Sequence, residues 1–349
     1  MEFLFDYGLF LAKIITLLVA IIIVIITIIG MSQRTRHPEK GHIEVFSLND
    51  NIENITRTLK HVVMNPQALK LESKAEKKRH KEEAKVQKQE AKSGDGERKP
   101  RVYVVDFEGD VQASGVSQLR EEVTAILSVA EDKDEVIVRL ESPGGIVHGY
   151  GLGASQLSRI VGKSISLTVA VDKVAASGGY MMACIANRLI AAPFAILGSI
   201  GVVAQIPNFH RLLKNKDIDV EVLTAGEYKR TLTIFGENTE KGREKFIEEL
   251  EDVHLMFKDF VAENRPGIDM DIVATGEAWY GKRALEHNLV DALQTSDEYI
   301  YDRCQEADVY RVKYVEDKNR VDKILDRFTA AFKRFSRRDD YRYQGPYTF

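Results

Sequence analysis

The chain has 349 residues, of which 44% are apolar and 29% charged, and its net charge is −4. This length suffices for one sizeable hydrophobic core or two small ones. The small net charge excludes a bulk preference for nucleic acid. The two cysteines, Cys184 and Cys304, form no CxxC pair, which argues against a zinc site or a disulfide framework. We therefore expect a globular protein without a metal, a cofactor or a nucleic-acid partner.

The N-terminal residues are strongly apolar. No charged residue lies between Ile14 and Gly30. With residues 9–13 the stretch reaches about 22 residues, which is enough to cross a bilayer core of about 30 Å as a helix. The alternative is a cleaved signal peptide, which has a basic start and an apolar region of about 7–15 residues. This chain instead begins MEFLFD. We expect an uncleaved, single-pass transmembrane helix in the cell inner (cytoplasmic) membrane.

The charges beside this segment indicate its orientation. Arg34, Arg36 and Lys40 follow it, whereas only Lys13 and the α-amino group lie at its other end. Positive charges are enriched on the cytoplasmic side of membrane spans, which favours a cytoplasmic location for the rest of the chain. The difference in charge is small, so the side of the membrane stays open.

Two short regions follow the anchor and its flank, residues 1–41. Residues 42–69 indicate a short strand and a helix that ends near Pro66. Residues 70–100 carry many charges and almost no large apolar side chain, which is typical of a solvated helix or a tether. A basic arm that binds membrane or RNA is the alternative, but glutamates are interleaved throughout. We interpret this region as a charged linker.

Residues 101–315 have the pattern of an α/β domain. Short apolar runs alternate with stretches in which apolar residues recur at helical spacing, and this alternation predicts βαβ units around a mostly parallel sheet. We expect strands at residues 102–107, 135–140, 165–171, 189–192, 202–205 and 220–223, and helices at 116–127, 178–186 and 240–264.

The C-terminal residues 316–349 form a separate amphipathic and basic segment with a tail. Within it, residues 321–338 place apolar side chains on one helix face and basic side chains behind them. Such a helix lies on an anionic membrane surface or packs between protomers, and the sequence does not choose between the two.

A glycine turn follows one predicted strand. Ser142, Pro143, Gly144 and Gly145 come directly after residues 135–140, at the strand end where open α/β sheets bind ligands. Adjacent glycines expose backbone N–H groups, which suit an oxyanion hole or an extended peptide. A tight turn that needs positive φ is the equally good structural reading.

A serine opens a predicted helix after another strand, in Ala175-Ala176-Ser177-Gly178-Gly179. At a helix N-terminus Ser177 lies in a positive field, and the next N–H can hold an oxyanion. An ordinary N-cap serine is the competing reading. The G-x-S-x-G motif of other hydrolases is absent because residue 175 is alanine.

A serine nucleophile needs a base. No histidine lies between Ser177 and His210, and His148 has the position of a surface residue on the helix after the glycine turn. Lys229 follows a predicted strand, and burial could hold a lysine in the neutral form that a base requires. A single lysine is usually a solvated surface charge, so the residues alone leave Lys229 open.

Five motifs occur in one order over residues 101–295: SPGG, AASGGY, ANRLIAAPFAILGSIGV, GEYKR and GEAWYGKRALEHNLVDAL. In this order they resemble the signal peptide peptidase A / SohB family of membrane serine proteases. The resemblance implies a Clp protease/crotonase-like fold. It also implies that residues 101–315 are a serine protease catalytic domain.

The resemblance also implies roles for individual residues. Ser177 becomes the nucleophile and Lys229 the general base of a Ser-Lys dyad. The N–H of Gly178, with that of Gly144 or Gly145, forms the oxyanion hole, and Ser199 orients the base.

The resulting expectation is a membrane-bound serine endopeptidase that acts on membrane-derived peptides or misfolded proteins. The family resemblance further implies a homo-oligomeric ring in which Ser177 and Lys229 meet across an interface. Three alternatives compete: a crotonase-like hydratase or isomerase, a Clp-type Ser-His-Asp protease, and a non-enzymatic membrane scaffold. The presence of both Ser177 and Lys229, and the lack of a suitable histidine, argue against them.

Overall fold

The computed structural model describes residues 6–18, 41–71 and 98–316, together with positions 74, 78, 81 and 82. The chain divides into two units, of which Ile43–Tyr314 holds nearly all the regular structure. In the other unit, residues 6–18 form an exposed helix. Most of the predicted anchor, most of the charged linker and the C-terminal segment 321–338 lie outside the described residues. Among the residues that are described, none of the helices combines the length and the apolar character needed to span a bilayer.

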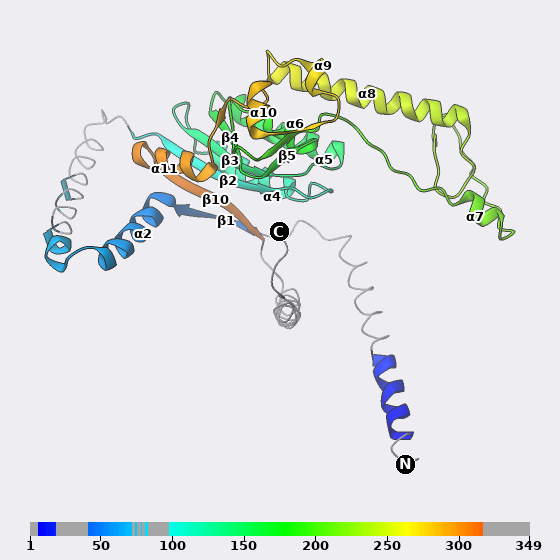
Figure 1. Cartoon of the computed structure of the whole chain (residues 1–349), viewed down its shortest axis with the longest axis horizontal. Coiled ribbons are helices and arrows are strands. Elements are labelled where there is room, and N and C mark those ends of the chain that lie inside the picture. The colour runs from blue at the N-terminus through cyan, green and yellow to red at the C-terminus, as the bar shows by residue number, and fades with distance from the viewer. Residues whose placement is uncertain are drawn as a thin grey trace, which may run out of the picture. The chain divides into compact units, whose positions relative to one another are not determined.

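The main sheet has seven strands in the order β1-β10-β2-β3-β4-β6-β9 (Figure 1). From β10 to β9, each strand pairs with its neighbour in parallel. The mostly parallel α/β sheet predicted from the sequence is therefore confirmed. The strands are β1 (Gly41–Ser47), β2 (Arg101–Glu108), β3 (Glu135–Glu141), β4 (Ser166–Val171), β6 (Arg188–Ala191), β9 (Ala292–Leu293) and β10 (Asp308–Glu316).

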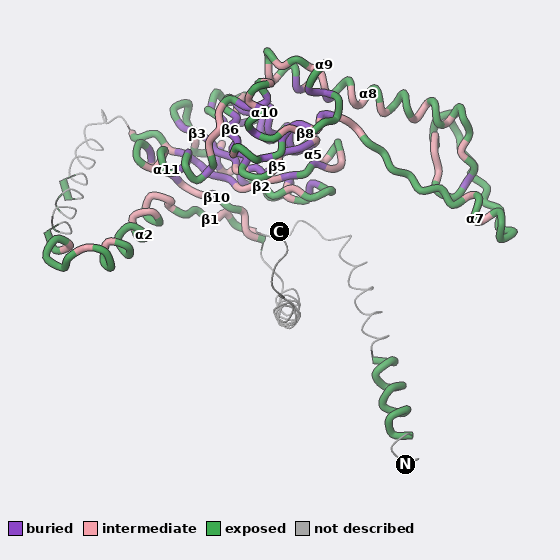
Figure 2. The backbone as a smooth tube through the Cα atoms, in the orientation of Figure 1, coloured by how far each residue is buried: buried purple, intermediate pink, exposed green. Residues whose placement is uncertain are grey.

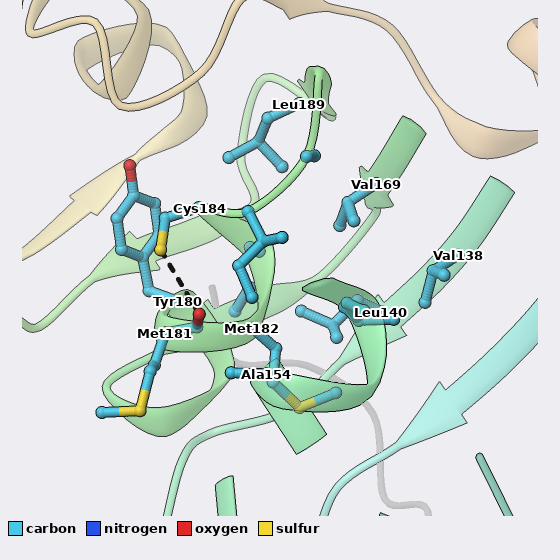
Figure 3. Close-up of a cluster of buried hydrophobic side chains, with 14 of the residues drawn as sticks. Val138, Leu140, Ala154, Val169, Tyr180, Met181, Met182, Cys184 and Leu189 are labelled. Atoms are coloured by element: carbon cyan, nitrogen blue, oxygen red, sulfur yellow. Dashed lines mark hydrogen bonds between the residues drawn. The ribbon is translucent and has the colours of Figure 1, made fainter. Parts of the chain in front are cut away.

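Helices cover both faces of this sheet. Tyr103, Val105 and Phe107 of β2 pack into a core with α4 (Val116–Leu127), α5 (Val147–Val161) and α6 (Gly178–Ala183). The alternate residues Val102 and Val104 pack with α11 (Ser296–Glu306) on the opposite face, because successive strand side chains point to opposite sides. Figure 3 shows part of the first core, and in Figure 2 the buried residues concentrate in the sheet and these helices.

A smaller sheet contains β5 (Val174–Ala176), β7 (Ile196–Gly198) and β8 (Ala278–Tyr280). Strands β5 and β7 are parallel, whereas β8 runs antiparallel to β7. A parallel bridge from Ser142 to Ala175 connects β5 to the residue after β3. The smaller sheet thus continues from the carboxyl end of the main sheet.

The remaining helices connect or flank these layers. Helix α2 follows β1 and ends before Pro66, as the sequence predicted, and Ser47 caps its first turn. These elements are α2 (Leu48–Val63), α7 (His210–Lys214), α8 (Glu240–Asn264), α9 (Met270–Val273) and α10 (Gly281–Glu286).

A long excursion between β7 and α8 projects from the sheets (Figure 1). We call residues 201–239 the arm. Its hydrogen bonds are largely internal, such as those from the Asn208 side chain to the carbonyls of Thr233 (2.9 Å) and Gly236 (3.1 Å). The strands predicted at 202–205 and 220–223 are wrong, because these residues lie in exposed coil without a sheet edge to pair with.

Helix α8 joins the arm to the body of the molecule. Thr239 caps it by accepting a hydrogen bond from the N–H of Gly242. Only its second half is anchored: Phe257 and Val261 are buried, and His254 Nε2 lies 3.2 Å from the carbonyl oxygen of Ile200. The predicted helix at 240–264 is confirmed, but its first half projects with the arm (Figure 2).

A buried carboxylate on α4 predicts a pH-dependent stability. Glu122 is 4% exposed and accepts a hydrogen bond from the N–H of Tyr314 (2.8 Å). Burial raises its pKa from 4.5 to about 7, aided by the charge of Asp106 and opposed by Tyr314, Lys313 and Arg311. Because the folded protein binds this proton more tightly than the unfolded chain, stability is lost as the pH rises from 4.5 through 7.

Glu122→Gln removes the titrating carboxyl group and with it this loss of stability at rising pH. We expect its free energy of unfolding, relative to the unmodified chain, to increase by about 3 kcal/mol between pH 4.5 and 8. Urea unfolding at both pH values measures the change. The exposed neighbour Glu121 provides the control, since Glu121→Gln should show no comparable trend. A pH-independent Glu122→Gln difference would contradict the expected titration.

Candidate active site

Two chain segments meet where β3 and β5 end. The N–H of Ser142 donates to the carbonyl oxygen of Val174 (2.8 Å), and the N–H of Ala176 donates to that of Ser142 (3.0 Å). These bonds place the turn of residues 142–145 beside the segment that leads into Ser177. The site predicted from two separate motifs is thus one place in the fold.

Ser177 occupies an unusual backbone conformation. Its φ is 52° and its ψ is −119°, a region that non-glycine residues rarely adopt and that costs on the order of 1–3 kcal/mol. The N–H of Ser177 donates to the carbonyl oxygen of Gly198 (2.8 Å), and its own carbonyl accepts from Met181 (3.0 Å). The strained backbone of Ser177 is therefore held by a hydrogen bond to β7 through its N–H and by a hydrogen bond from α6 through its carbonyl oxygen. Its half-buried side chain makes no hydrogen bond within the described residues.

Two glycines next to Ser177 leave no room for a side chain. A Cβ atom at Gly144, whose φ is 89°, would lie 2.7 Å from Ser177 Cβ and 3.0 Å from the nitrogen of Gly178. A Cβ at Gly178 would lie 2.4 Å from Cγ of Tyr150. Gly144 therefore meets both needs read from the sequence, a positive φ and a close backbone approach.

The backbone N–H groups around Ser177 differ in their availability. The N–H of Gly144 donates to Oγ of Ser142 (3.1 Å). Those of Gly145 and Gly178 have no acceptor among the described residues. The unengaged donors beside Ser177 are thus Gly145 and Gly178, and such donors can stabilise an oxyanion.

Ser199 lies beside Ser177. Strands β5 and β7 pair with Ala176 opposite Gly198, and the N–H of Ser177 bonds to the carbonyl oxygen of Gly198. The residue after Gly198, Ser199, therefore follows directly beside Ser177. Ser199 also has a φ of 52°, and its N–H donates to the carbonyl oxygen of Glu277 (2.7 Å). The structure brings together Ser177, Ser199 and the three predicted glycines.

Lys229 is not part of this group in the single chain. It is exposed on the arm, next to Tyr228, whose ring lies 5.9 Å from Nζ of Lys241 in the first turn of α8. Between Lys241 and His254, where α8 reaches the body, the helix spans about 20 Å. Figure 1 shows this half of α8 leading away from the sheets. The burial expected for a lysine base is therefore absent from the isolated chain.

Other candidate chemistries find little support around the site. His148 is exposed on α5, as the sequence predicted. Over the ranges 6–18, 41–71 and 98–316, no group of three or more His, Cys, Asp or Glu side chains could hold a metal ion. Sequence reasoning overlooked two buried hydroxyls beneath the glycine turn, those of Ser142 and Tyr150, which lie 2.6 Å apart.

Comparison with known proteins identifies the family of the chain. Residues 2–157 match the N-terminal model of peptidase family S49, and residues 160–310 match the model of peptidase family S49 itself. The chain belongs to peptidase family S49 and is a protease.

Several relatives carry the name of one member of this family. The chain is 52% identical over 326 residues to the probable protease SohB of Haemophilus influenzae, with 93% of this chain and 92% of the relative covered. It is 47% identical over 306 residues to that of Buchnera aphidicola, with 87% and 100% covered. A solved membrane-bound stomatin-specific protease with a substrate peptide has a TM-score of 0.42 and 15% identity, covering 67% of this chain and 100% of that one.

The close contacts around Gly144 predict that a side chain at this position reduces peptide hydrolysis. In Gly144→Ala the added methyl group must displace Ser177 or the Gly178 N–H, so we expect peptide hydrolysis to fall by about 100-fold or more, the effect of losing an oxyanion donor. Gly151→Ala is the matched control, because a Cβ at this α5 position meets nothing within 4 Å. It should keep full activity and gain about 0.5–1 kcal/mol of stability. Retained activity in Gly144→Ala would contradict this geometry.

Proposed function

We propose that the chain is a serine endopeptidase in which Ser177 is the nucleophile and Lys229 the general base. The observation that carries this proposal is the setting of Ser177. It is a strained serine, flanked by the N–H groups of Gly145 and Gly178, and neither its hydroxyl nor these two N–H groups have a hydrogen-bond partner among the residues that the structure describes. Strained residues that the surrounding structure over-determines cluster at active sites.

The reaction follows from these groups. Oγ of Ser177 attacks the carbonyl carbon of the scissile peptide bond and gives its proton to neutral Nζ of Lys229. The carbonyl oxygen becomes an oxyanion that accepts hydrogen bonds from the free N–H groups. Lys229 then donates the proton to the leaving amine, and water hydrolyses the acyl-enzyme by the same steps.

The hydrogen bond that the Gly144 N–H already makes favours Gly145 and Gly178 as the pair of oxyanion donors. That N–H is occupied by Ser142 Oγ, which leaves Gly145 as the partner of Gly178. Gly144 contributes by its lack of a side chain, because this lets the turn lie against Ser177. Ser199, which follows directly after the neighbouring strand β7, is suited to accept a hydrogen bond from the incoming lysine and orient it.

A second copy of the chain supplies the lysine in this proposal. The arm holds Lys229 far from the serine of its own chain, and α8 keeps it there. Arm side chains such as Val203 and Leu223 are 91% and 89% exposed. Exposed apolar surface of this kind is typical of an interaction site. An arm that lies on a neighbouring copy would cover these side chains and deliver Lys229 to Ser177 in a head-to-tail, homo-oligomeric ring.

The proposal extends to the type of α/β fold and to the attachment of the chain to a membrane. The sheet with helices on both faces is compatible with a Clp protease/crotonase-like domain. The apolar stretch from Ile14 to Gly30 supports a single-pass membrane anchor, with the catalytic domain on the cytoplasmic side. An anchored endopeptidase would meet membrane-derived peptides and misfolded proteins as substrates.

The role of Lys229 as general base can be tested by the pH dependence of hydrolysis. Because lysine accepts a proton only when neutral, hydrolysis of a fluorogenic peptide should rise toward alkaline pH without the histidine inflection near about 6.5. Ser177→Ala and Lys229→Ala should each abolish turnover, with the unfolding transition unchanged.

Two variants serve as controls for this test. Lys214→Ala removes another exposed lysine of the arm, and His148→Ala removes the histidine nearest to the glycine turn in sequence. Both should keep nearly full activity. A Lys229→Ala protein with substantial turnover would refute the Ser-Lys dyad.

A further inference from the structure

Ser142 is completely buried where β3 gives way to the glycine turn. Its backbone is fixed to β5 by two hydrogen bonds, as described above. Its side chain lies below the turn and accepts the Gly144 N–H. Ser142 therefore connects three parts of the site: the end of β3, the strand ahead of Ser177, and the turn that holds Gly145.

The hydroxyl of Ser142 belongs to a chain of hydrogen bonds in which each donor and acceptor can be assigned. Oη of Tyr150 donates to the carbonyl oxygen of Asp110 (2.7 Å), which can only accept. The bond between Ser142 Oγ and Tyr150 Oη (2.6 Å) must then use the serine proton. The chain of donors thus runs from the Gly144 N–H through Ser142 and Tyr150 to Asp110. Successive bonds of this kind polarise and strengthen one another.

Tyr150 also contacts the second oxyanion donor. Its ring supports Gly178, where an added Cβ would lie 2.4 Å from Cγ of the ring. Its hydroxyl reaches the glycine turn through Ser142. One completely buried side chain on α5 thus touches Gly178 directly and holds the turn of Gly144 and Gly145 through one intermediate.

Burial also strengthens the hold of Tyr150 on its proton. It raises the pKa of Tyr150 above the ordinary value of 10, an effect opposed by the bond to Ser142. The phenol therefore stays a donor to a higher pH than an exposed tyrosine would.

We infer that Ser142 and Tyr150 are positioning residues that fix the spacing between the oxyanion donors Gly145 and Gly178. This role rests on the proposed function, because it acts through the donors on the oxyanion formed at Ser177. Both side chains are completely buried, which keeps them out of direct contact with a bound peptide. Loss of either hydroxyl should therefore weaken stabilisation of the tetrahedral state while leaving the binding of uncleaved peptide largely intact.

Tyr150→Phe in the full chain tests this role against a merely structural one. We expect kcat for a fluorogenic peptide to fall about tenfold, less than for loss of an entire donor, with KM within about twofold of that of the unmodified chain. Affinity for a peptidyl boronate, which forms a tetrahedral adduct with the serine, should fall by a similar factor. Peptide affinity, measured on a Ser177→Ala background, should stay unchanged.

Tyr180→Phe is the matched control. Tyr180 is equally buried and donates its hydroxyl to the carbonyl oxygen of Leu289 (2.8 Å), away from the glycine turn. Tyr180→Phe loses the same type of donor bond, from a buried phenol to a backbone carbonyl, so it should lose stability with kcat and boronate affinity preserved. Equal effects of the two substitutions on kcat would overturn the positioning role.

Ser142→Ala provides an independent variant. Because it interrupts the same chain of bonds, its effect on kcat and that of Tyr150→Phe should not add in the double variant. Full additivity would overturn the shared role. An unmodified chain that neither hydrolyses peptide nor binds the boronate would refute the proposed function itself, and the positioning role with it. If the unmodified chain hydrolyses peptide normally and Tyr150→Phe has the same kcat and boronate affinity, only the positioning role is refuted.

Discussion

The two backbone hydrogen bonds between Ser142 and β5 set the geometry on which the rest of the site depends. They tie the glycine turn after β3 to the three residues ahead of Ser177. The pairing of β5 with β7 then brings Ser199 alongside. No single element builds the site. It exists because the two sheets share one boundary at Ser142, so a shift of either sheet would separate Ser177 from the N–H groups of the glycine turn.

The same boundary explains why strain is tolerated there. Ser177 and Ser199 both have positive φ values, and each donates its N–H to a neighbouring segment, Ser177 to the carbonyl oxygen of Gly198 and Ser199 to that of Glu277. The buried ring of Tyr150 behind them fills the space that Gly178 leaves open. The rigid half of the site is therefore built from the core outward, whereas Lys229 is carried by an exposed arm. This contrast between the rigid setting of Ser177 and the exposed position of Lys229 is the basis for proposing a site completed by a second copy.

Much of this arrangement could be predicted from the sequence, and the failures have physical causes. Long apolar runs predicted β2, β3 and β4, because strands buried on both faces need apolar residues throughout. The three-residue strands β5 and β7 were too short to give such a signal. Residues 202–205 and 220–223 resemble strands in composition, but the isolated chain offers them no partner edge. Pairing depends on tertiary context, which local pattern does not encode.

The candidate site was predicted unevenly for similar reasons. Ser177 and the glycines were visible because strand ends and helix starts are local features. Lys229 was selected only by resemblance to a family, since an exposed lysine on a loop has no distinctive pattern of its own. The hydroxyl of Tyr150 gave no signal, because its partners Ser142 and Asp110 are brought to it by the fold.

The central claim is that Ser177 of one copy works with Lys229 of another, and mixing two inactive variants tests it most directly. Ser177→Ala and Lys229→Ala proteins, combined in equal amounts under conditions that allow subunit exchange, should form about a quarter of their junctions with both residues intact. The account predicts a corresponding partial return of peptide hydrolysis, absent from either variant alone. If both residues act within one chain, no mixture will regain turnover, and the shared site is contradicted.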